Sequence, residues 1–479
     1  MIDFILNDQD ICTGQPPGTT VLDFVRYHKD LKGTKIGCRE GDCGACTVMV
    51  GELVGDQVKY RTMTSCLMPL ANAAGKHIVT VEGINPPDGS MTPVQQAMVD
   101  ESGTQCGFCT VGFVMSLTNF CVDDTAKTRE MAVSAIDGNI CRCTGYKSIE
   151  RAGSVVSGQL SVVSSLTDVA DKLDLAIKSK VVPSYFSGIK ERLAKVSEKS
   201  NRQPTTDNRQ LQFVSGGTDL YVQHPEHMAE SDTTPLLYDE QLRGIRDVGE
   251  HIEIGGSATV TDLLVSPVMQ SVFPHLYKHL KLVSSTPIRN MATLAGNFVN
   301  ASPIGDMTVW FLALDASIVL SVASASADAS AERDIKLRDL YLGYKQLAKQ
   351  PDEMITAIRF KKPGGDFRFN FEKVCKRTYL DIATVNTAIS LSVASASADA
   401  FTITDAHVSA GGVAPIPFYL KETSAFLTGK IVTEATIAAA NEIMQSEISP
   451  ISDVRGTESY KRLLLRQLFR AHFYEVFGA

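Results

Sequence analysis

Cysteine is concentrated at one end of this 479-residue chain: ten of its eleven cysteines lie in the first 143 residues, and Cys375 is the other one. A segment so rich in cysteine folds around disulfides or around bound metal. The first residues contain no basic stretch followed by a long apolar one, so we expect no secretory signal and few disulfides. We therefore expect a metal or redox module in this part of the chain and a different kind of fold in the rest.

The overall composition is that of a multidomain globular protein. At about 150 residues per domain the length corresponds to about three domains, and a hydrophobic content of 44% allows sizeable cores. The net charge of −8 argues against a nucleic-acid-binding face. Residues 308–322 are apolar, but the stretch is short and contains Asp315, so we expect a buried helix followed by a strand rather than a membrane span. A cytoplasmic protein is the resulting expectation.

The first group of cysteines has the spacing C-x4-C-x2-C followed by a distant fourth member: Cys38, Cys43, Cys46 and Cys66. This is the spacing of plant-type [2Fe–2S] ferredoxins, which we interpret as three thiolates on one tight loop and a fourth at a distant strand end. Glycines at 37, 41 and 44 allow sharp turns that direct backbone N–H groups at sulfur. Structural zinc is the alternative, but zinc ribbons usually use two C-x2-C pairs, so an iron–sulfur cluster is favoured.

The second group pairs C-x2-C with C-x-C: Cys106, Cys109, Cys141 and Cys143. Taken alone this pattern is ambiguous, because zinc or a redox disulfide would also use such pairs. Cys109 lies at the start of a predicted helix, whose N-terminus favours the negative charge of a thiolate-bound cluster. A second [2Fe–2S] cluster in a helical domain is therefore the favoured interpretation.

Three cysteines belong to neither group: Cys12, Cys121 and Cys375. Nothing in their spacing links them to one another or to the two groups. Unpaired cysteine is among the most buried residue types in proteins, so we expect all three to be buried free thiols without a ligand role.

The pattern of apolar residues changes several times along the chain. Before residue 85 it predicts strands at 2–8, 47–63 (two strands around a turn at 51–56) and 77–82, with a helix at 20–29. Helices are then predicted at 92–100, 108–121, 126–136 and 148–159. Residues 160–180 are polar and suggest a linker, and mixed strands and helices follow from 181. Beyond the charged turn at 361–365, strands are predicted at 367–375, 384–394 and 401–409, and helices at 433–446 and 458–476.

One ten-residue sequence, LSVASASADA, occurs twice, at 320–329 and at 391–400. Chance identity over ten residues is negligible. Each copy follows a strand-like stretch and precedes another, so we expect each to form a Ser/Ala-rich hairpin loop. We assign it no function.

Two glycine- and amide-containing segments suggest close contact between backbone and a ligand. Residues 213–220 combine a strand, a double-glycine turn and a Thr-Asp pair, and a turn of this kind exposes successive N–H groups to a pyrophosphate. An ordinary tight turn explains the same residues. Residues 289–306 cluster small and amide side chains between apolar stretches. No G-x-G-x-x-G motif or P-loop occurs in the sequence, so neither a Rossmann nor a Walker site is supported.

Three cysteine-containing segments, residues 37–48, 104–110 and 141–146, together resemble the signatures of the molybdenum hydroxylases. The best match is the iron–sulfur/FAD small subunit of two-component xanthine dehydrogenases. One departure is Val111, where the family usually has proline; it lies outside the ligands, and little effect is expected. Residues 213–220 and 289–306 resemble the FAD-binding domain of the same family, so the resemblance covers nearly the whole chain.

The resemblance implies a multidomain α+β fold with four domains. These are a β-grasp ferredoxin-like [2Fe–2S] domain at 1–84, a helical-bundle [2Fe–2S] domain at 85–160, a linker at 161–180, an FAD-binding α+β domain of the vanillyl-alcohol-oxidase type at 181–365 and a C-terminal α+β flavoprotein domain at 366–479.

The resemblance also assigns residues to the cofactors. The eight cysteines of the two groups would bind two [2Fe–2S] clusters, and Gln105 would lie near the pterin of a partner. The residues implied to hold FAD are Phe213, Val214, Ser215, Gly216, Gly217, Thr218, Asp219, Leu220, Thr293, Leu294, Ala295, Gly296, Asn297, Asp306, Ile355 and Lys373. Tyr344 would lie near the flavin ring, where nicotinamide is expected. Core packing, a surface lysine and a core tyrosine are the alternative interpretations of Ile355, Lys373 and Tyr344.

By the same resemblance the chain is the electron-transfer subunit of an NAD-dependent xanthine dehydrogenase that acts in purine (hypoxanthine and xanthine) oxidation. A separate large subunit with the molybdopterin cofactor would oxidise the substrate, and the two chains would assemble as a heterotetramer. Electrons would pass through the helical-domain cluster, the ferredoxin-like cluster and FAD to NAD⁺. The alternatives are the small subunit of an aldehyde or N-heterocycle dehydrogenase and a stand-alone iron–sulfur flavoprotein reductase. The second group of cysteines argues against the last of these.

Overall fold

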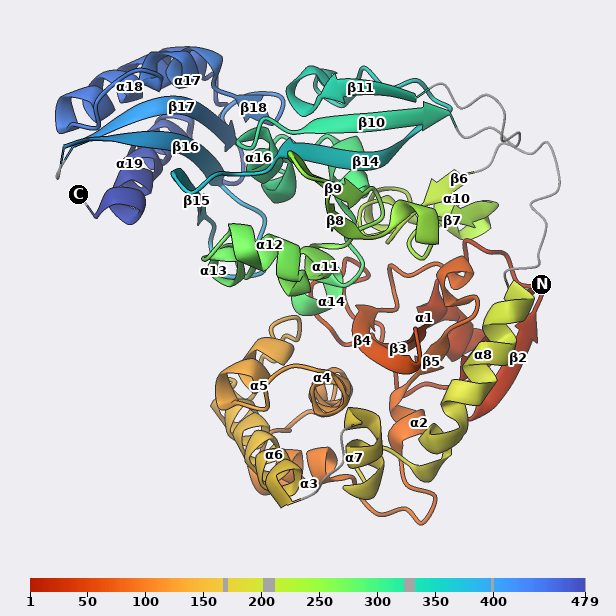
Figure 1. Ribbon diagram of the computed structural model, residues 1–479. Coiled ribbons are helices and arrows are strands. Elements are labelled where there is room, and N and C mark those ends of the chain that lie inside the picture. The colour runs from red at the N-terminus through yellow and green to blue at the C-terminus, as the bar shows by residue number, and fades with distance from the viewer. Residues whose placement is uncertain (167–170, 201–211, 323–331, 398–399, 479) are drawn as a thin grey trace. The chain divides into compact units, whose positions relative to one another are not determined.

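A computed structural model of the chain describes residues 1–166, 171–200, 212–322, 332–397 and 400–478. Contacts within the chain divide it into two units (Figure 1). The first comprises Met1–Leu237 together with Ser285–Ala292, and the second comprises Tyr238–Ser284 together with Thr293–Ala479.

The first unit begins with a five-stranded sheet in the order β2-β1-β5-β3-β4. Its strands are β1 (Ile2–Leu6), β2 (Gln9–Thr13), β3 (Thr47–Val54), β4 (Gln57–Thr64) and β5 (His77–Val79), and the short helices α1 (Val21–Asp23), continued by a π-helical turn at Phe24–His28, and α2 (Val81–Ile84) accompany them. The strands β1 and β5 are parallel, whereas β3 and β4 form an antiparallel hairpin. The turn expected at 51–56 is shorter than predicted, because Gly51 lies inside β3, where a Cβ would come within 2.6 Å of the Tyr60 ring.

A helical domain follows the sheet. Its helices are α3 (Pro93–Asp100), α4 (Thr110–Val122), α5 (Arg129–Ala135), α6 (Lys147–Leu166) and α7 (Lys172–Lys178). The predicted start of α3 is confirmed, since the Thr92 hydroxyl and the Gln95 side chain cap each other's backbone N–H groups. From Gly112 to its end α4 is buried, which explains why this helix is apolar on all sides.

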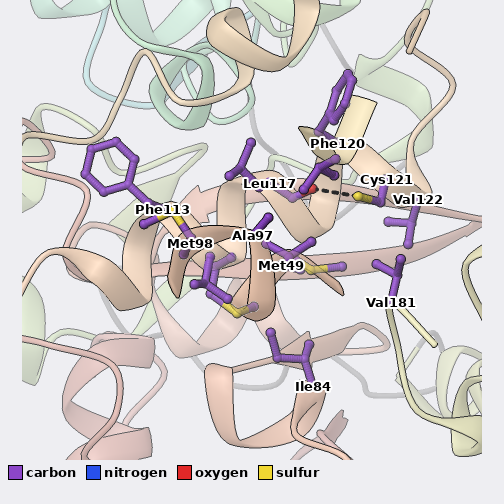
Figure 2. Packing of buried hydrophobic residues seen from close by; sticks show 14 of the residues in the cluster. Met49, Ile84, Ala97, Met98, Phe113, Leu117, Phe120, Cys121, Val122 and Val181 are labelled. Atoms are coloured by element: carbon purple, nitrogen blue, oxygen red, sulfur yellow. Dashed lines mark hydrogen bonds between the residues drawn. The ribbon is translucent and has the colours of Figure 1, made fainter. Parts of the chain in front are cut away.

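The sheet and the helices share one hydrophobic core. Figure 2 shows Phe113, Leu117 and Phe120 of α4 packed together with Met49 of β3 and with Val181. Since residues from both expected iron–sulfur domains contribute to this cluster, the two domains stabilise each other through apolar burial.

The segment predicted to be a linker, 161–180, is mostly helical where the structure describes it, so this prediction is wrong in part. The helix α6 continues to Leu166, and α7 begins after the cap provided by Asp171; residues 167–170 lie outside the described part. Leu175 and Ala176 are buried, so the polar composition of the segment concealed a helix with one apolar face.

Residues placed at the start of the expected FAD-binding domain also pack on this first module. Val181 and Phe186 belong to the shared core, and the helix α8 (Ile189–Ser200) buries Ile189 and Leu193 against Ile5 of β1. The chain therefore still packs on the first module beyond residue 181, where the FAD-binding domain was expected to begin. The other domain boundaries stay predictions.

The rest of the first unit consists of short elements: β6 (Gln212–Val214), β7 (Thr233–Pro235), α9 (Leu220–Gln223), α10 (Pro225–Glu230) and α14 (Thr286–Arg289). The strands β6 and β7 form a parallel pair. The segment Ser285–Ala292 is attached to the sheet by the Asn290 Nδ2, which donates to the Thr62 carbonyl over 2.8 Å, and to the helical domain by the Arg289–Asp137 ion pair of 2.7 Å.

The second unit contains another five-stranded sheet, in the order β11-β10-β14-β9-β8. Its strands are β8 (Ile245–Asp247), β9 (His251–Gly255), β10 (Ser317–Val322), β11 (Glu332–Lys336) and β14 (Glu353–Lys361), and β12 (Tyr341–Gly343) and β13 (Gln346–Leu347) form a separate small hairpin. The helices are α11 (Val260–Val265), α12 (Pro267–Val272), α13 (Leu276–Leu280), α15 (Leu294–Asn300) and α16 (Asp306–Leu312). The buried helix and strand predicted for 308–322 are confirmed as α16 and β10, and no helix in the described residues has the length and apolar character needed to cross a membrane.

The last part of the chain forms a four-stranded sheet in sequential order, β15-β16-β17-β18, covered by three helices (Figure 1). The bounds are β15 (Phe367–Val374), β16 (Val385–Ser397), β17 (Ala400–Gly411), β18 (Phe418–Tyr419), α17 (Lys421–Leu427), α18 (Glu434–Glu447) and α19 (Glu458–Phe477). Side chains of the sheet and of all three helices meet in one apolar core, so the strands and terminal helices predicted from the sequence are confirmed.

The repeated sequence is not a hairpin loop in its second copy. The residues from Leu391 to Ser397 belong to β16, where Leu391 and Val393 are buried and lie opposite Ala406 and Ile403. Burial of alternate apolar residues stabilises a strand here, which the Ser/Ala composition did not indicate. The first copy begins in β10, and its remainder, from 323, lies outside the described residues, as do 398–399 of the second.

Candidate iron–sulfur and flavin sites

The first cysteine group lies at one end of the ferredoxin-like sheet. Cys38, Cys43 and Cys46 precede β3, and Cys66 follows β4, so the predicted loop and distant strand end are both present. Cys46 and Cys66 are buried, with exposed fractions of 2% and 4%, whereas Cys38 and Cys43 are half-buried. The predicted backbone donors are present as well: the N–H groups of Glu40 and Cys43 lie 3.3 and 3.4 Å from the Cys38 sulfur.

The four thiols of this group form two pairs. A hydrogen bond from Cys43 lowers the pKa of Cys38 to about 5, and the same bond raises the pKa of Cys43. A hydrogen bond from the Cys66 thiol lowers the pKa of Cys46, and that bond together with burial raises the pKa of Cys66. In the described residues no group of three or more His, Cys, Asp or Glu side chains is arranged to hold one metal ion. Two thiolates for each of two irons is the ligand arrangement of a [2Fe–2S] cluster, so the donor set fits that cofactor.

The second cysteine group has the same pairing in a more open setting. Cys106 and Cys143 are exposed and hydrogen-bonded to each other. A hydrogen bond from the Phe108 N–H lowers the pKa of Cys106 most, and the bond to Cys143 lowers it further. The same bond between the two thiols raises the pKa of Cys143. Burial, followed by a hydrogen bond to Cys141, raises the pKa of Cys109 to about 12. Cys109 precedes α4 as its N-cap residue, as predicted. These four thiols therefore also fit two irons.

The two cysteine loops are bonded directly to each other. The N–H of Ile140, which precedes Cys141, donates to the Cys43 carbonyl over 3.0 Å. The Asn139 side chain donates to the Gly44 carbonyl over 3.1 Å and accepts from Ser116 over 2.7 Å. Cys141 of the second group is thus separated from Cys43 of the first by one residue and one hydrogen bond, and the buried amide of Asn139 holds this arrangement in place.

The three remaining cysteines differ in exposure. Cys121 is 1% exposed and donates to the Leu117 carbonyl over 3.1 Å, so the prediction of a buried free thiol is confirmed (Figure 2). Cys375 is half-buried. Cys12 is exposed, so the prediction is wrong there: it lies in β2, where Ile11 points into the core and its neighbour faces solvent.

The double-glycine turn of the expected FAD site belongs to the first unit. It follows β6, and Gly216 and Gly217 are both buried, with a φ of +78° at Gly217. A Cβ at Gly216 would come within 1.9 Å of the Met291 carbonyl oxygen, so close packing alone already requires glycine. Within the described residues, however, neither glycine's N–H donates a hydrogen bond. Two buried N–H groups without partners in one turn fit a phosphate ligand.

The segment 293–297 belongs to the second unit and is partly structural. Thr293 caps α15 by accepting from the Gly296 N–H over 3.2 Å, and Leu294 is a fully buried core residue. Ala295 donates its N–H to the Gly256 carbonyl over 3.1 Å. Asn297 Oδ1 accepts from the N–H and the hydroxyl of Thr308, over 3.2 and 3.0 Å. The roles of these residues toward FAD stay predictions.

Asp306 and Lys373, which the sequence assigned separately to FAD, lie together. The Lys373 ammonium donates to the Asp306 carboxylate over 2.7 Å and to the Leu282 carbonyl over 2.7 Å. The Lys373 side chain is 1% exposed, so it is not a surface lysine. Asp306 is the first residue of α16, where a carboxylate is favoured by the helix dipole, and its side chain is 12% exposed.

The last two residues assigned to FAD, Ile355 and Tyr344, differ in burial. Ile355 is 3% exposed in β14 and lies opposite Leu320, which is the position of a core residue. Tyr344 is 63% exposed between β12 and β13, so it is not a core tyrosine. Gln105 is exposed beside Cys106.

Two amides at these sites were not predicted from the sequence, Asn139 and Asn386. Asn139 joins the two cysteine loops, and Asn386 Nδ2 donates to the Asp306 carboxylate over 2.5 Å. The position of Asn139 two residues before Cys141 is a weak signal that could have suggested it. No local pattern marks Asn386, because its partner lies 80 residues away in the chain.

Comparison with known protein families gives matches to four domains in the same order. Residues 4–71 match the 2Fe-2S iron-sulfur cluster binding domain, and residues 80–154 match a [2Fe-2S] binding domain. Residues 192–362 match the FAD binding domain in molybdopterin dehydrogenase, and residues 371–476 match the CO dehydrogenase flavoprotein C-terminal domain.

Individual proteins give the same result. The chain is 27% identical to xanthine dehydrogenase of Emericella nidulans over 96% of its own length and 37% of that protein, and 25% identical to aldehyde oxidase 4 of Cavia porcellus over 98% of its length and 39% of that protein. Among solved structures, a Cu,Mo-CO dehydrogenase in its cyanide-inactivated form matches with a TM-score of 0.50 and 25% identity, over 56% of this chain and 90% of the other. The chain thus spans less than two fifths of the length of these two relatives.

With two [2Fe–2S]-binding domains followed by an FAD-binding domain, the chain is an iron–sulfur flavoprotein. The four matched domains and the relatives support a molybdenum hydroxylase iron–sulfur/FAD subunit, as predicted, and the predicted fold class and cofactor domains are confirmed.

Proposed function

We propose that this chain is the electron-transfer part of a xanthine dehydrogenase-type molybdenum hydroxylase and works with a molybdopterin-containing partner chain. The observation that carries the proposal is the presence of two complete four-thiol groups, joined by the Ile140–Cys43 hydrogen bond, on one chain with the FAD-binding domain. When bound, the clusters would carry single electrons and FAD would exchange between one-electron and two-electron carriers. The comparisons with molybdenum hydroxylases support the class of reaction.

The chain's own contribution is to hold and insulate the ligands. In the first group, backbone N–H groups directed at the Cys38 sulfur stabilise its thiolate form. Cys46 and Cys66 are withdrawn from water, which strengthens each electrostatic interaction that their sulfurs make. In the first unit, the N–H groups of Gly216 and Gly217 would bind a pyrophosphate, as the predicted FAD site requires. In the second unit, Asp306 and Lys373 are proposed as FAD-binding residues.

The substrate is proposed to be a purine, hypoxanthine or xanthine, with NAD⁺ as the acceptor, in a heterotetramer with the molybdenum chain and in the cytoplasm. The similarity to the xanthine dehydrogenase of Emericella nidulans supports a purine substrate. An aldehyde or N-heterocycle is the second candidate class, and the similarity to aldehyde oxidase 4 supports it. A stand-alone reductase is less well supported, because one ferredoxin-like group would suffice for that role.

Co-purification tests this proposal. The tagged chain, expressed with its genomic neighbours, should recover a molybdenum-containing partner, with about four irons and about four labile sulfides per tagged chain. Hypoxanthine, xanthine, an aldehyde and an N-heterocycle are then compared as substrates, with NAD⁺ reduction followed at 340 nm and oxygen as the competing acceptor. Bound zinc without visible absorbance, or a lone chain with one cluster, would contradict the proposal.

A further inference from the structure

Asn386 is the second residue of β16 and is completely buried, with an exposed fraction of 0%. Its Nδ2 donates to Asp306 Oδ1 over 2.5 Å and to the Ile304 carbonyl over 3.2 Å. Its own Oδ1 has no hydrogen-bond partner among the described residues. The polar contacts of this side chain therefore all serve the turn that leads into Asp306.

Asn386 and Lys373 act on the same carboxylate from neighbouring strands. They are directly opposite each other in the β15–β16 pairing. Lys373 donates to Asp306 Oδ2, and Asn386 donates to Oδ1. A carboxylate bonded at one oxygen can still rotate about its own axis, whereas donors at both oxygens fix its plane. The remaining lone pairs of the two oxygens stay available to a donor such as a ligand hydroxyl.

The adjoining strand is built to accommodate this amide. Gly411 of β17 lies opposite Asn386, and a Cβ at Gly411 would come within 2.2 Å of Asn386 Oδ1 and 3.0 Å of the Pro303 carbonyl oxygen. The next residue, Gly412, donates its N–H to that same Pro303 carbonyl over 2.9 Å. Two strands of the C-terminal sheet thus hold the residues from Pro303 to Asp306 at close range.

From this geometry we propose that Asn386 is a positioning residue for FAD. It orients the Asp306 carboxylate, so that Asp306 can accept a hydrogen bond from a hydroxyl or N–H group of the bound dinucleotide. The inference rests on the proposed function, in which Asp306 contacts FAD. It assigns to the C-terminal sheet a direct part in preparing that contact, through the pair formed by Asn386 and Lys373.

The test is the affinity of the deflavinated protein for FAD, measured by quenching of flavin fluorescence. Asn386→Leu removes the donor at nearly constant size and should weaken FAD binding by about tenfold or more, as expected for loss of a hydrogen bond to a charged group. The matched control is Asn441→Leu: Asn441 is 3% exposed, donates once to the Arg466 carbonyl over 3.2 Å and also has an unpartnered Oδ1. This control should lower stability without changing the FAD dissociation constant more than about twofold.

A second variant tests the role by its pH dependence. Asn386→Asp places a carboxyl against the Asp306 carboxylate, so FAD affinity should be weakest at high pH and should recover as the pH falls and the pair shares one proton. Asn441→Asp should show no such recovery. If Asn386→Leu does not fold, Asn386→Ser, which keeps a hydroxyl donor, should bind FAD more tightly than Asn386→Ala.

The outcomes separate the two claims. Equal FAD affinity of Asn386→Leu and the unaltered chain, or a pH profile of Asn386→Asp like that of Asn441→Asp, would overturn the positioning role and leave the proposed function intact. Failure of the unaltered chain to bind FAD at all would instead overturn the proposed function.

Discussion

The two cysteine groups each consist of four thiols in two pairs, but their surroundings differ. In the first group Cys46 and Cys66 are buried, whereas in the second Cys106 and Cys143 are exposed. Cysteine spacing therefore determines which metal centre is favoured, and the covering chain determines how far water reaches it. Because an exposed sulfur is screened by water, the second group depends less on burial and more on its local hydrogen bonds.

The glycines of the two loops show where the covering comes from. A Cβ at Gly41 would come within 2.7 Å of Ile288 and 2.8 Å of Leu67, so the first loop is closed by neighbouring side chains. A Cβ at Gly107 or Gly145, in the second group, would meet nothing within 4 Å. The segment that carries Ile288 is thus part of the insulation of the first group, and the second has no counterpart among the residues near these two glycines.

The largest expected effect is the loss of one cluster by substitution of one ligand. Cys43→Ser should remove the first cluster and leave the second, and Cys143→Ser should do the reverse, so iron should fall from about four to about two per chain in each. Iron and sulfide analysis and electron paramagnetic resonance measure this. Unchanged spectra in either variant would show that its ligand assignment is wrong, and loss of both signals would show that the groups are not separate.

A smaller effect is expected when the cover of the first group is loosened. Arg289 has a 4% exposed side chain and pairs with Asp137, so Arg289→Met leaves a buried carboxylate without its cation and should lower the unfolding free energy by about 3–5 kcal/mol. It should also let a chelator remove iron from the first group faster, and so reduce the difference between the groups. Denaturant unfolding and chelation kinetics measure the two effects. Arg151→Met is the control, because its ion pair with Glu101 is exposed and contributes about 0–1 kcal/mol.

The sequence predicts those parts of the sites whose residues lie close together in the chain. The eight cysteines proposed as ligands and the cap at Thr92 are set by short spacings, and the structure has the predicted loop, strand end and helix starts. The pairing of Cys38 with Cys43 and of Cys106 with Cys143 required the folded loops, because spacing alone does not determine which thiols meet.

The features that the sequence did not predict either have partners far away in the chain or lie in segments of misleading composition. Asn139 bonds to Gly44, 95 residues away, and no periodic pattern marks a single buried amide. The segment 161–180 contains many polar residues, yet Leu175 lies in the core and stabilises a helix. The second copy of LSVASASADA forms a strand because its Leu and Val alternate toward the C-terminal core.

The link between the two groups gives a third, smaller prediction. Asn139 is 5% exposed, so Asn139→Leu leaves the Gly44 carbonyl and the Ser116 hydroxyl without this partner and should lower the unfolding free energy by about 1–3 kcal/mol. If the amide holds the loops together, iron should become easier to chelate from both groups at once. Asn119→Leu is the control: Asn119 is 7% exposed in the same helical domain, and its Nδ2 bonds to Asp123 of its own segment. Faster iron loss from only one group would show that Asn139 does not couple them.

Acid should also distinguish the two iron–sulfur domains. Burial lowers the pKa of His77 to about 3, and its neutral ring accepts from the Tyr60 hydroxyl and donates to the Asn7 carbonyl. Because the unfolded chain binds this proton near pH 6.5 and the folded chain only near pH 3, stability is lost as the pH falls between these values, by about 1.4 kcal/mol per pH unit. Residues 85–160 contain no histidine, so of the two iron–sulfur domains only the ferredoxin-like one has such a term. His77→Gln should reduce the slope of unfolding free energy against pH between 4 and 6 by about that amount, and an unchanged slope would show that His77 is not the group that titrates.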